Sequence, residues 1–342
     1  MEQSRGINFF GKEEGMKTGV SAIVPVVLLG STAAPGQELS VRPVATYSIV
    51  ALDSATGQLG VAVQSHWFSV GTVVPWAQAG VGAVATQSFA KIDYGPDGLR
   101  LMAGGMTAEE ALVRLIDQDP GQDVRQVAMV DGKGNVAVHT GSRCIQAAGH
   151  LTGKGYSVQA NLMASATVWP AMARAFESAR GDLADRMLAA LEAAEKEGGD
   201  IRGRQSAAML IVTGEPSGVP WKDVVLDLRV EDDPEPLKEL RRLVRIHRAY
   251  EHANRGDLLL EKDNVEGALE EYRKAAGLYP ENPELPFWTA VTLADGGRLE
   301  EALPIFKKVF AEDSRWRELV PRLVTSNLLP DDPQVIEAIV RQ

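Results

Sequence analysis

Cysteine is almost absent from this chain, and the spacings of the usual metal and catalytic motifs are missing. The 342 residues include one cysteine, Cys144, so no internal disulfide can form. The five histidines are scattered and no Cys/His group has the spacing of a zinc site, so we expect neither a metal nor a cofactor. GxSxG, the P-loop and HExxH do not occur, so the chain lacks the familiar signatures of these three enzyme classes.

Basic charge is also scarce. Lys and Arg number 35 against 46 Asp and Glu, which gives a net charge of -11. No run of Lys or Arg supplies the basic face of a nucleic-acid-binding protein, so we expect no nucleic-acid partner. Hydrophobic residues make up 45% and charged residues 24% of the chain, which is an ordinary balance for a globular protein. The length of the chain suggests about two domains.

Long apolar runs are missing except near the N-terminus. A lysine is followed there by the apolar run 20–29 and then by small residues, the layout of a secretory signal peptide with cleavage before Ala34. The alternative is a buried or membrane-spanning helix, but the run is short for a bilayer and Pro25 interrupts it. We therefore predict a signal peptide and leader over 1–45, a secreted or periplasmic protein, and no stable membrane span after signal removal.

Turn-forming residues divide the middle of the chain into strands and helices. Strands are predicted at 47–52, 59–65, 81–87, 125–130, 136–140, 156–162, 206–212 and 224–229. Helices are predicted at 98–104, 107–118, 167–179 and 182–196, and Thr107 with Glu110 fits a capping box. Hairpins dominate, so the sheets are antiparallel and the helical blocks cover them. The predicted fold is α+β, a four-layer αββα sandwich over 46–230.

A repeat follows the acidic, proline-containing segment 230–239. Residues 249–282 align with 283–316, each copy being 34 residues long. The aligned pairs are Ala268 with Ala302, Leu269 with Leu303, Tyr272 with Phe306 and Lys274 with Lys308. The first copy carries Gly256, Ala268, Tyr272, Ala275 and Pro280 at the offsets of a tetratricopeptide repeat. The alternative is an unrelated helical bundle. We predict an all-α tetratricopeptide-repeat segment over 237–342, with a possible protein partner.

Several stretches of the chain together resemble a known family. They include TYSIVALDSATGQLGVAVQS, VGTVVPWAQAGVGAVATQS, RQVAMVDGKGNVAVHTG, AGHLTGKGYSVQANLM and GDIRGRQSAAMLIV. In these the chain resembles the Ntn-hydrolase-like family numbered 1028 among the domains of unknown function. The resemblance implies the four-layer Ntn-hydrolase-like fold and brings no established substrate. Many members begin with Met-Thr, so that removal of the methionine leaves threonine first; the matching residue here is Thr46, which 45 residues precede.

A first-residue threonine would combine nucleophile and base in one residue. Its hydroxyl attacks, and its own α-amine, with a pKa of about 7.7–8.0, accepts the proton. An oxyanion site is also needed, for which Gln87 and Asn161 are candidates at the ends of predicted strands. This chemistry requires a cut between Ala45 and Thr46. The alternative is that Thr46 is a strand-opening residue, which its β-branch suits.

Other polar residues gather at strand ends. Ser65, a further catalytic candidate, and His66 close the second predicted strand and could line a cleft. Arg202, Arg204, Gln205 and Ser206 lie just before an apolar strand. An arginine there could bind a substrate carboxylate, or it could pair with Asp200 or another acid as a structural bridge.

Two functions follow from these patterns. One is an exported amidohydrolase that cleaves an amide or peptide-like bond in an unknown small substrate. The other is a non-catalytic Ntn-like scaffold that binds a protein partner through its repeats.

Overall fold

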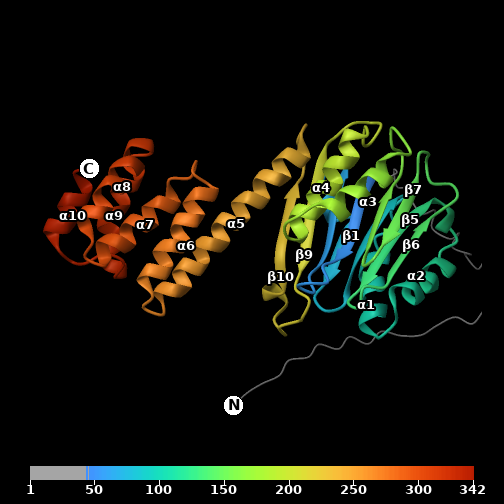
Figure 1. Cartoon of the computed structure of the whole chain (residues 1–342), viewed down its shortest axis with the longest axis horizontal. Coiled ribbons are helices and arrows are strands. Elements are labelled where there is room, and N and C mark those ends of the chain that lie inside the picture. The colour runs from blue at the N-terminus through green and yellow to red at the C-terminus, as the bar shows by residue number, and fades with distance from the viewer. Residues whose placement is uncertain (1–43, 45) are drawn as a thin grey trace, which may run out of the picture. The chain divides into compact units, whose positions relative to one another are not determined.

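A computed structural model describes residue 44 and residues 46–342 of the chain (Figure 1). Within this part lie ten α-helices and ten strands, and the strands form two antiparallel sheets. The predicted signal peptide, its cleavage site before Ala34 and the predicted leader, Val44 excepted, fall outside the described residues. No helix of the described part combines the length and apolar character needed to cross a bilayer.

The larger sheet has six strands in the order β10, β9, β2, β1, β8, β7. They are β1 (Thr46–Leu52), β2 (Leu59–Ser65), β7 (Gly149–Gly153), β8 (Tyr156–Ala160), β9 (Ser206–Val212) and β10 (Val224–Val230). β1 and β2 form the predicted hairpin, in which Thr46 lies opposite Ser65. Ser206 of β9 lies opposite Ser65 on the other side of β2. The register therefore gathers three hydroxyl-bearing residues at one end of the sheet.

The smaller sheet has four strands in the order β3, β4, β5, β6. They are β3 (Pro75–Gln78), β4 (Gly82–Ser88), β5 (Arg125–Asp131) and β6 (Val136–Thr140). Eight of the ten strands lie where the sequence predicts them, to within two residues at each end. β3 and β7 are missing from the prediction because both are short, and each contains residues that weaken strand propensity, proline in β3 and glycine in β7.

Helices cover the outer face of each sheet (Figure 1). α1 (Tyr94–Ala103) and α2 (Ala108–Asp117) pack on the smaller sheet, and α3 (Val168–Ser178) and α4 (Leu183–Lys196) pack on the larger one. The predicted capping box of α2 is confirmed, since Thr107 and Glu110 exchange their side-chain and backbone hydrogen bonds. A separate apolar cluster fills the space between the two sheets.

Strand alternation decides which side chains of β1 face the space between the sheets. Tyr47 and Ile49 belong to the cluster beneath α3 and α4, whereas Val50 belongs to the cluster between the sheets. Ser48 reaches across to β4, where its hydroxyl donates to Gln87. Because side chains alternate with period two, Thr46 lies on the same face as Ser48 and Val50. The first residue of the strand is thereby directed between the sheets.

The C-terminal segment is helical throughout. It contains α5 (Pro236–Leu260), α6 (Val265–Leu278), α7 (Glu284–Asp295), α8 (Leu299–Glu312), α9 (Arg315–Leu323) and α10 (Pro333–Val340). α6 and α8 begin 34 residues apart and end 34 residues apart, in step with the sequence repeat. The aligned Ala268 and Ala302 are both fully buried. The mixed α+β class, the antiparallel sheets and the helical C-terminal segment are therefore confirmed.

The first turns of α5 pack on the larger sheet. Leu237, Leu240 and Val244 are buried in the same cluster as the side chains of α3 and α4. Further along the helix, Arg248 lies 2.7 Å from Asp182 Oδ1 and 3.0 Å from Asp185 Oδ2, both near the start of α4. The later turns of α5 pair with α6. One continuous helix therefore contributes to both the sandwich and the helical segment.

Candidate functional site

Thr46 opens β1 and is completely buried. Its hydroxyl donates to Val44 O at 2.7 Å, and its Oγ1 lies 3.2 Å from Ser65 Oγ. The antiparallel register makes this contact, because Thr46 and Ser65 are direct partners across β1 and β2. The structure thus brings together the predicted nucleophile and one further predicted catalytic residue.

The carbonyl of Thr46 is held by the other two predicted catalytic residues. Asn161 N donates to Thr46 O at 3.0 Å, and Asn161 Nδ2 lies 3.5 Å from the same oxygen. Gln87 Nε2 lies 3.3 Å from it. Both side-chain amides are therefore adjacent to Thr46, on its carbonyl side. Their predicted role in an oxyanion site stays a prediction.

Behind Thr46 a layer of polar side chains connects the two sheets. Gln126 of β5 is its centre, since Gln126 Oε1 accepts from Gln87 Nε2 at 2.7 Å and from Asn161 Nδ2 at 3.0 Å. Gln126 Nε2 in turn donates to Thr140 Oγ1 at 2.9 Å and to Ala160 O at 3.0 Å. We call this set, with Ser48 and Gln159, the amide seam. Gln159 Nε2 donates to Ser48 Oγ at 2.6 Å, so the seam extends along β1 and β8.

Sequence reasoning missed Gln126, Gln159 and Ser88. The available signal was a polar residue inside or ending an otherwise apolar strand, as in RQVAMV and YSVQA. Such a residue must find a partner when it is buried, because an unpaired amide in an apolar interior is costly. The signal says that a partner exists without saying which residue it is.

One polar atom beside Thr46, Asn161 Oδ1, is buried without a hydrogen-bond partner in the described part of the chain. Ser88, which pairs with Val44, has φ +69°, an uncommon backbone conformation for a residue other than glycine. A buried unpaired group needs an explanation, and strained backbone is common at active sites, so these two features make the Thr46 end of the sandwich a candidate functional site.

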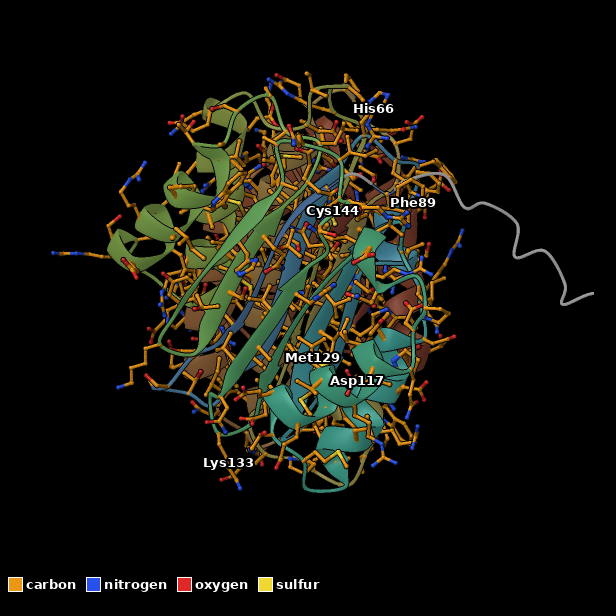
Figure 2. The ribbon with its side chains drawn as sticks, turned by 90° about the vertical axis from the view of Figure 1, so that its right-hand side faces the viewer. His66, Phe89, Asp117, Met129, Lys133 and Cys144 are labelled. Carbon is orange, nitrogen blue, oxygen red and sulfur yellow. The ribbon has the colours of Figure 1, made fainter. Side chains whose placement is uncertain are left out.

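Cys144 lies close to Ser88. Burial raises the pKa of the Cys144 thiol, and the Ser88 hydroxyl and a backbone group of Gly141 only partly offset that rise. The thiol is therefore protonated at neutral pH and is a poor nucleophile. Figure 2 shows Cys144 toward the same end of the sheets as Phe89 and His66, away from Lys133.

The remaining predicted site residues lie around the end of β2. His66 N donates to the buried carboxylate of Asp200 at 3.1 Å, and Arg202 Nη2 pairs with the same oxygen at 2.8 Å. Arg202 is thus the arginine that pairs with Asp200. Arg204 is paired with Glu195, whose carboxylate also accepts from Tyr47 at 2.6 Å.

Gln205 and Ser206 are engaged with the protein itself. Gln205 Nε2 donates to Asp232 Oδ1 at 3.1 Å, and Ser206 Oγ accepts from Val70 N at 3.1 Å. Ser206 stands beside Ser65 in the sheet, whereas Gln205 points to the connection that leads to α5. The substrate-binding roles of His66, Arg204, Gln205 and Ser206 stay predictions. Among the described residues, no group of three His, Cys, Asp or Glu side chains could hold a metal ion.

The region that carries this site has relatives. Residues 46–240 match the family described as "Family of unknown function (DUF1028)". The chain belongs to this family. It is also similar to the crystal structure of a DUF1028 protein from Silicibacter pomeroyi, with 31% sequence identity and a TM-score of 0.52 over 59% of this chain and 88% of that one. No curated protein matches the chain.

Both bounds of the DUF1028 match fall on features of the fold. The match begins at Thr46, the residue that opens β1, and ends at Leu240, a buried residue in the first turns of α5. The DUF1028 region therefore contains the whole of both sheets and the whole of the amide seam.

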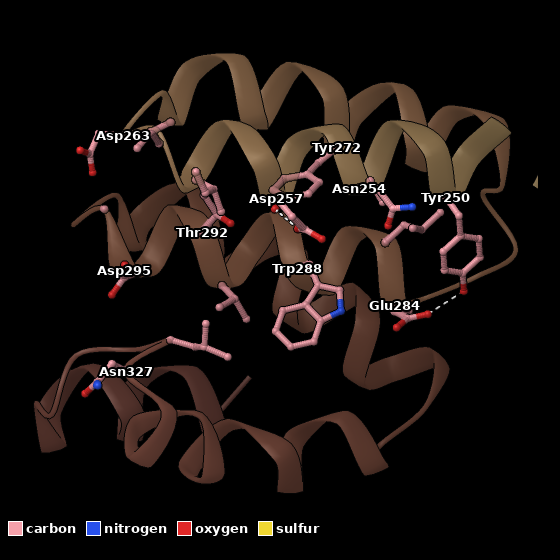
Figure 3. A pocket seen from close by; sticks show the side chains of 17 residues that line it. Tyr250, Asn254, Asp257, Asp263, Tyr272, Glu284, Trp288, Thr292, Asp295 and Asn327 are labelled. Carbon is pink, nitrogen blue, oxygen red and sulfur yellow. Dashed lines mark hydrogen bonds between the residues drawn. The ribbon is translucent and has the colours of Figure 1, made fainter. Parts of the chain in front are cut away.

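Outside the DUF1028 match, the helical segment has a pocket of about 650 Å³ (Figure 3). α5, α6 and α7 form most of its wall, and Trp288 lies at its centre in Figure 3. Its lining includes four carboxylates and, among the described residues, no Lys, Arg or His; the carboxylates are Asp257, Asp263, Glu284 and Asp295. Tyr272 donates to Asp257 at 2.6 Å and Tyr250 donates to Glu284 at 2.7 Å. The pocket is therefore apolar with a negative rim.

Proposed function

We propose that the DUF1028 region is an Ntn-hydrolase-like αββα domain and that the protein is an exported amidohydrolase with Thr46 as nucleophile. The observation that carries this proposal is the placement of Thr46. Its hydroxyl lies 3.2 Å from Ser65 Oγ, between two sheets, at the residue where the family match begins. A family whose shared region starts at this threonine fits a chemistry that needs threonine at the amino end.

Maturation is the first reaction. Thr46 Oγ1 attacks the carbonyl carbon of Ala45, the bond from that carbon to the Thr46 nitrogen breaks, and the nitrogen leaves as an amine that has taken the hydroxyl proton. Water then hydrolyses the ester, which releases a leader ending in the Ala45 carboxylate and restores the Thr46 hydroxyl. The freed α-amine becomes the base for later turnover, in which a substrate amide replaces the leader.

Ser65 has a positioning role in this scheme. Its Oγ is within hydrogen-bonding distance of Thr46 Oγ1, so it can orient the attacking lone pair. Asn161, whose Nδ2 is a hydrogen-bond donor 3.5 Å from Thr46 O, is the preferred candidate for the oxyanion site.

The mass of the protein exported by its native host tests the proposal. We expect a chain that begins at Thr46. Thr46→Ala should leave the leader attached, whereas Thr46→Ser should retain processing because its hydroxyl can attack in the same way. An active protein with an intact Ala45–Thr46 bond would rule out this mechanism, since the Thr46 nitrogen would still be an amide.

The pocket of the helical segment favours a second function. We propose that the 34-residue units are tetratricopeptide repeats and that their pocket binds a protein segment bearing lysine or arginine beside apolar side chains. Four carboxylates on an apolar lining complement such a segment in both charge and hydropathy. This function is compatible with the hydrolase and also stands without it.

A labelled peptide of alternating lysine and leucine is the probe for the second function. We expect salt-sensitive binding that Trp288→Ala and Asp295→Asn each weaken severalfold, because both residues line the pocket. Trp221→Ala and Glu300→Gln are the matched controls, since Trp221 and Glu300 are exposed and outside the pocket. Equal losses in controls and pocket variants would contradict the assignment.

A further inference from the structure

Val44 is held against the end of β4 like one residue of an added strand. Val44 N donates to Ser88 O at 2.6 Å, and Ser88 N donates to Val44 O at 2.9 Å. The two bonds form a closed antiparallel pair made only of backbone groups. The backbone oxygen of Ser88, the last residue of β4, can therefore accept a hydrogen bond from an extended peptide, and its backbone nitrogen can donate one. Neither bond depends on the side chains of that peptide.

The side chain of Val44 is buried as completely as a core residue. It is 1% exposed and belongs to the apolar cluster between the sheets, together with Val63, Val70 and Val74. These neighbours belong to the DUF1028 region, so the apolar space around Val44 is built by the domain rather than by the leader. A charged side chain in this space would lose its hydration without gaining a partner.

The residue held by Ser88 also contacts the nucleophile. Val44 O accepts from Thr46 Oγ1 at 2.7 Å as well as from Ser88 N. One peptide group thus bridges the strand end and the attacking hydroxyl. In the sequence Val44 is the second residue before the bond that maturation would cut.

Maturation and turnover share one chemical species, and this allows the leader to report on the substrate. In both reactions the acyl group becomes an ester on Thr46 Oγ1. In maturation that acyl group is the chain ending in Val44 and Ala45; in turnover it is the acyl part of the substrate. The ester oxygen is Thr46 Oγ1 in both reactions. The residue that precedes the acyl residue of the substrate can therefore reach the place that Val44 occupies in the leader.

We propose that the substrate is an extended peptide whose second residue before the scissile bond pairs with Ser88 and places a small apolar or β-branched side chain where Val44 lies. This inference rests on the proposed hydrolase function and adds to it a substrate class and a specificity-determining residue. Departure of the leader opens the backbone pair and the apolar space together, so the site is blocked before maturation and open after it.

The test uses the full-length protein after it has processed itself to Thr46. The probes are anilides of Arg-Pro-Val-Ala, which copies residues 42–45, of Arg-Pro-Lys-Ala, and of Arg-Pro-Val-Ala with an N-methylated valine. We expect kcat/KM for the first to exceed that for each of the others by at least about tenfold. The lysine peptide puts a charge into an apolar space, and the methylated one loses its bond to Ser88 O.

A second measurement examines the leader in place. Val44→Ile keeps the side chain apolar and β-branched and should process within about threefold of the natural chain, whereas Val44→Lys should process at least about tenfold more slowly. Circular dichroism checks that each variant has folded. Equal rates for the three anilides, or hydrolysis of none of them by processed protein, would overturn the subsite and leave the nucleophile in place. A natural chain that never processes would instead remove the hydrolase proposal, and the subsite with it.

Discussion

At the scale of single residues, the amide seam is the feature that most constrains the site. Gln126 alone connects Gln87, Asn161 and Thr140, which come from three different parts of the chain. Two of these three contact the Thr46 carbonyl. The position of the nucleophile therefore depends on hydrogen bonds made on the far side of its own carbonyl.

Replacing Gln126 tests this dependence. Gln126→Leu should lower the free energy of unfolding by at least about 2–3 kcal/mol, because it leaves several buried polar groups unpaired at about 1–3 kcal/mol each. Urea unfolding measures the loss. Gln78→Leu, at an exposed position of β3 in the same sheet, is the control and should change stability by less than about 0.5 kcal/mol. Similar losses of unfolding free energy in both variants would show that the amide seam does not contribute more to stability than an exposed position does.

The sequence predicts the hairpin that contains Thr46 and Ser65, and the structure gives its register. Seven residues of β1 and seven of β2 on either side of a turn-rich segment leave the first opposite the last. The sequence could not anticipate that Val44 pairs with Ser88. This contact joins segments far apart in the chain, and no periodicity encodes it.

At the scale of elements, the close contact between α5 and α6 depends on Gly256. A Cβ added there would lie 2.5 Å from Cε1 of Tyr272, whose ring is buried and whose hydroxyl donates to Asp257. Gly256→Ala should therefore lower stability by about 1–3 kcal/mol.

Gly277, in α6, is the matched control. No atom lies within 4 Å of its added Cβ, so Gly277→Ala should be neutral or stabilising by up to about 1 kcal/mol. Thermal unfolding distinguishes the two substitutions. A stabilising Gly256→Ala would mean that the helices separate at little cost.

An acid-sensitive cluster ties the same two helices. Lys274, His252 and Arg255 surround Glu271, and their hydrogen bonds lower the pKa of that carboxyl to about 2. A lowered folded-state pKa means stability that is fully present above the unfolded value of about 4.5 and is lost as pH falls toward 2. Glu271→Gln should be less stable than the natural chain at pH 7, with the difference closing below about pH 3 in thermal unfolding. A difference that persists unchanged at pH 2 would contradict this origin.

The elements that the sequence fails to predict share a physical cause. β3 has four residues and β7 has five, too few for a periodic pattern, and each is paired along its length with a neighbouring strand. The helical character of the C-terminal segment is predicted, because small residues at a fixed 34-residue period are a local pattern. Tertiary pairing, by contrast, is decided by residues outside the segment.

At the scale of the whole molecule, α5 joins two kinds of architecture. Its first turns are buried in the larger sheet's cluster and its later turns pair with α6. The sequence predicts a helical segment from 237 onward, and the structure shows that Leu237, Leu240 and Val244 complete the core of the sandwich.

Two truncations test where the sandwich ends. A chain that stops after Arg248 should stay folded, because it keeps these three side chains and the ion pairs of Arg248 with α4. A chain that stops after Val230 should lose several kcal/mol or aggregate, at about 1.5–3 kcal/mol for each lost buried side chain. Calorimetry and light scattering measure both. Equal stability of the two would place the end of the sandwich at β10.

The hydrogen bonds of the amide seam are directional, and this limits which parts of the domain can change in evolution. Apolar surfaces can slide over one another at little cost, but paired amides permit one alignment of the two sheets. The distance between Thr46 of the larger sheet and Gln87 of the smaller one is therefore set by the interior and not by the loops. The loops that connect the strands can lengthen, shorten or gain binding residues while that distance stays fixed. The specificity of the domain can therefore change without a change in its interior.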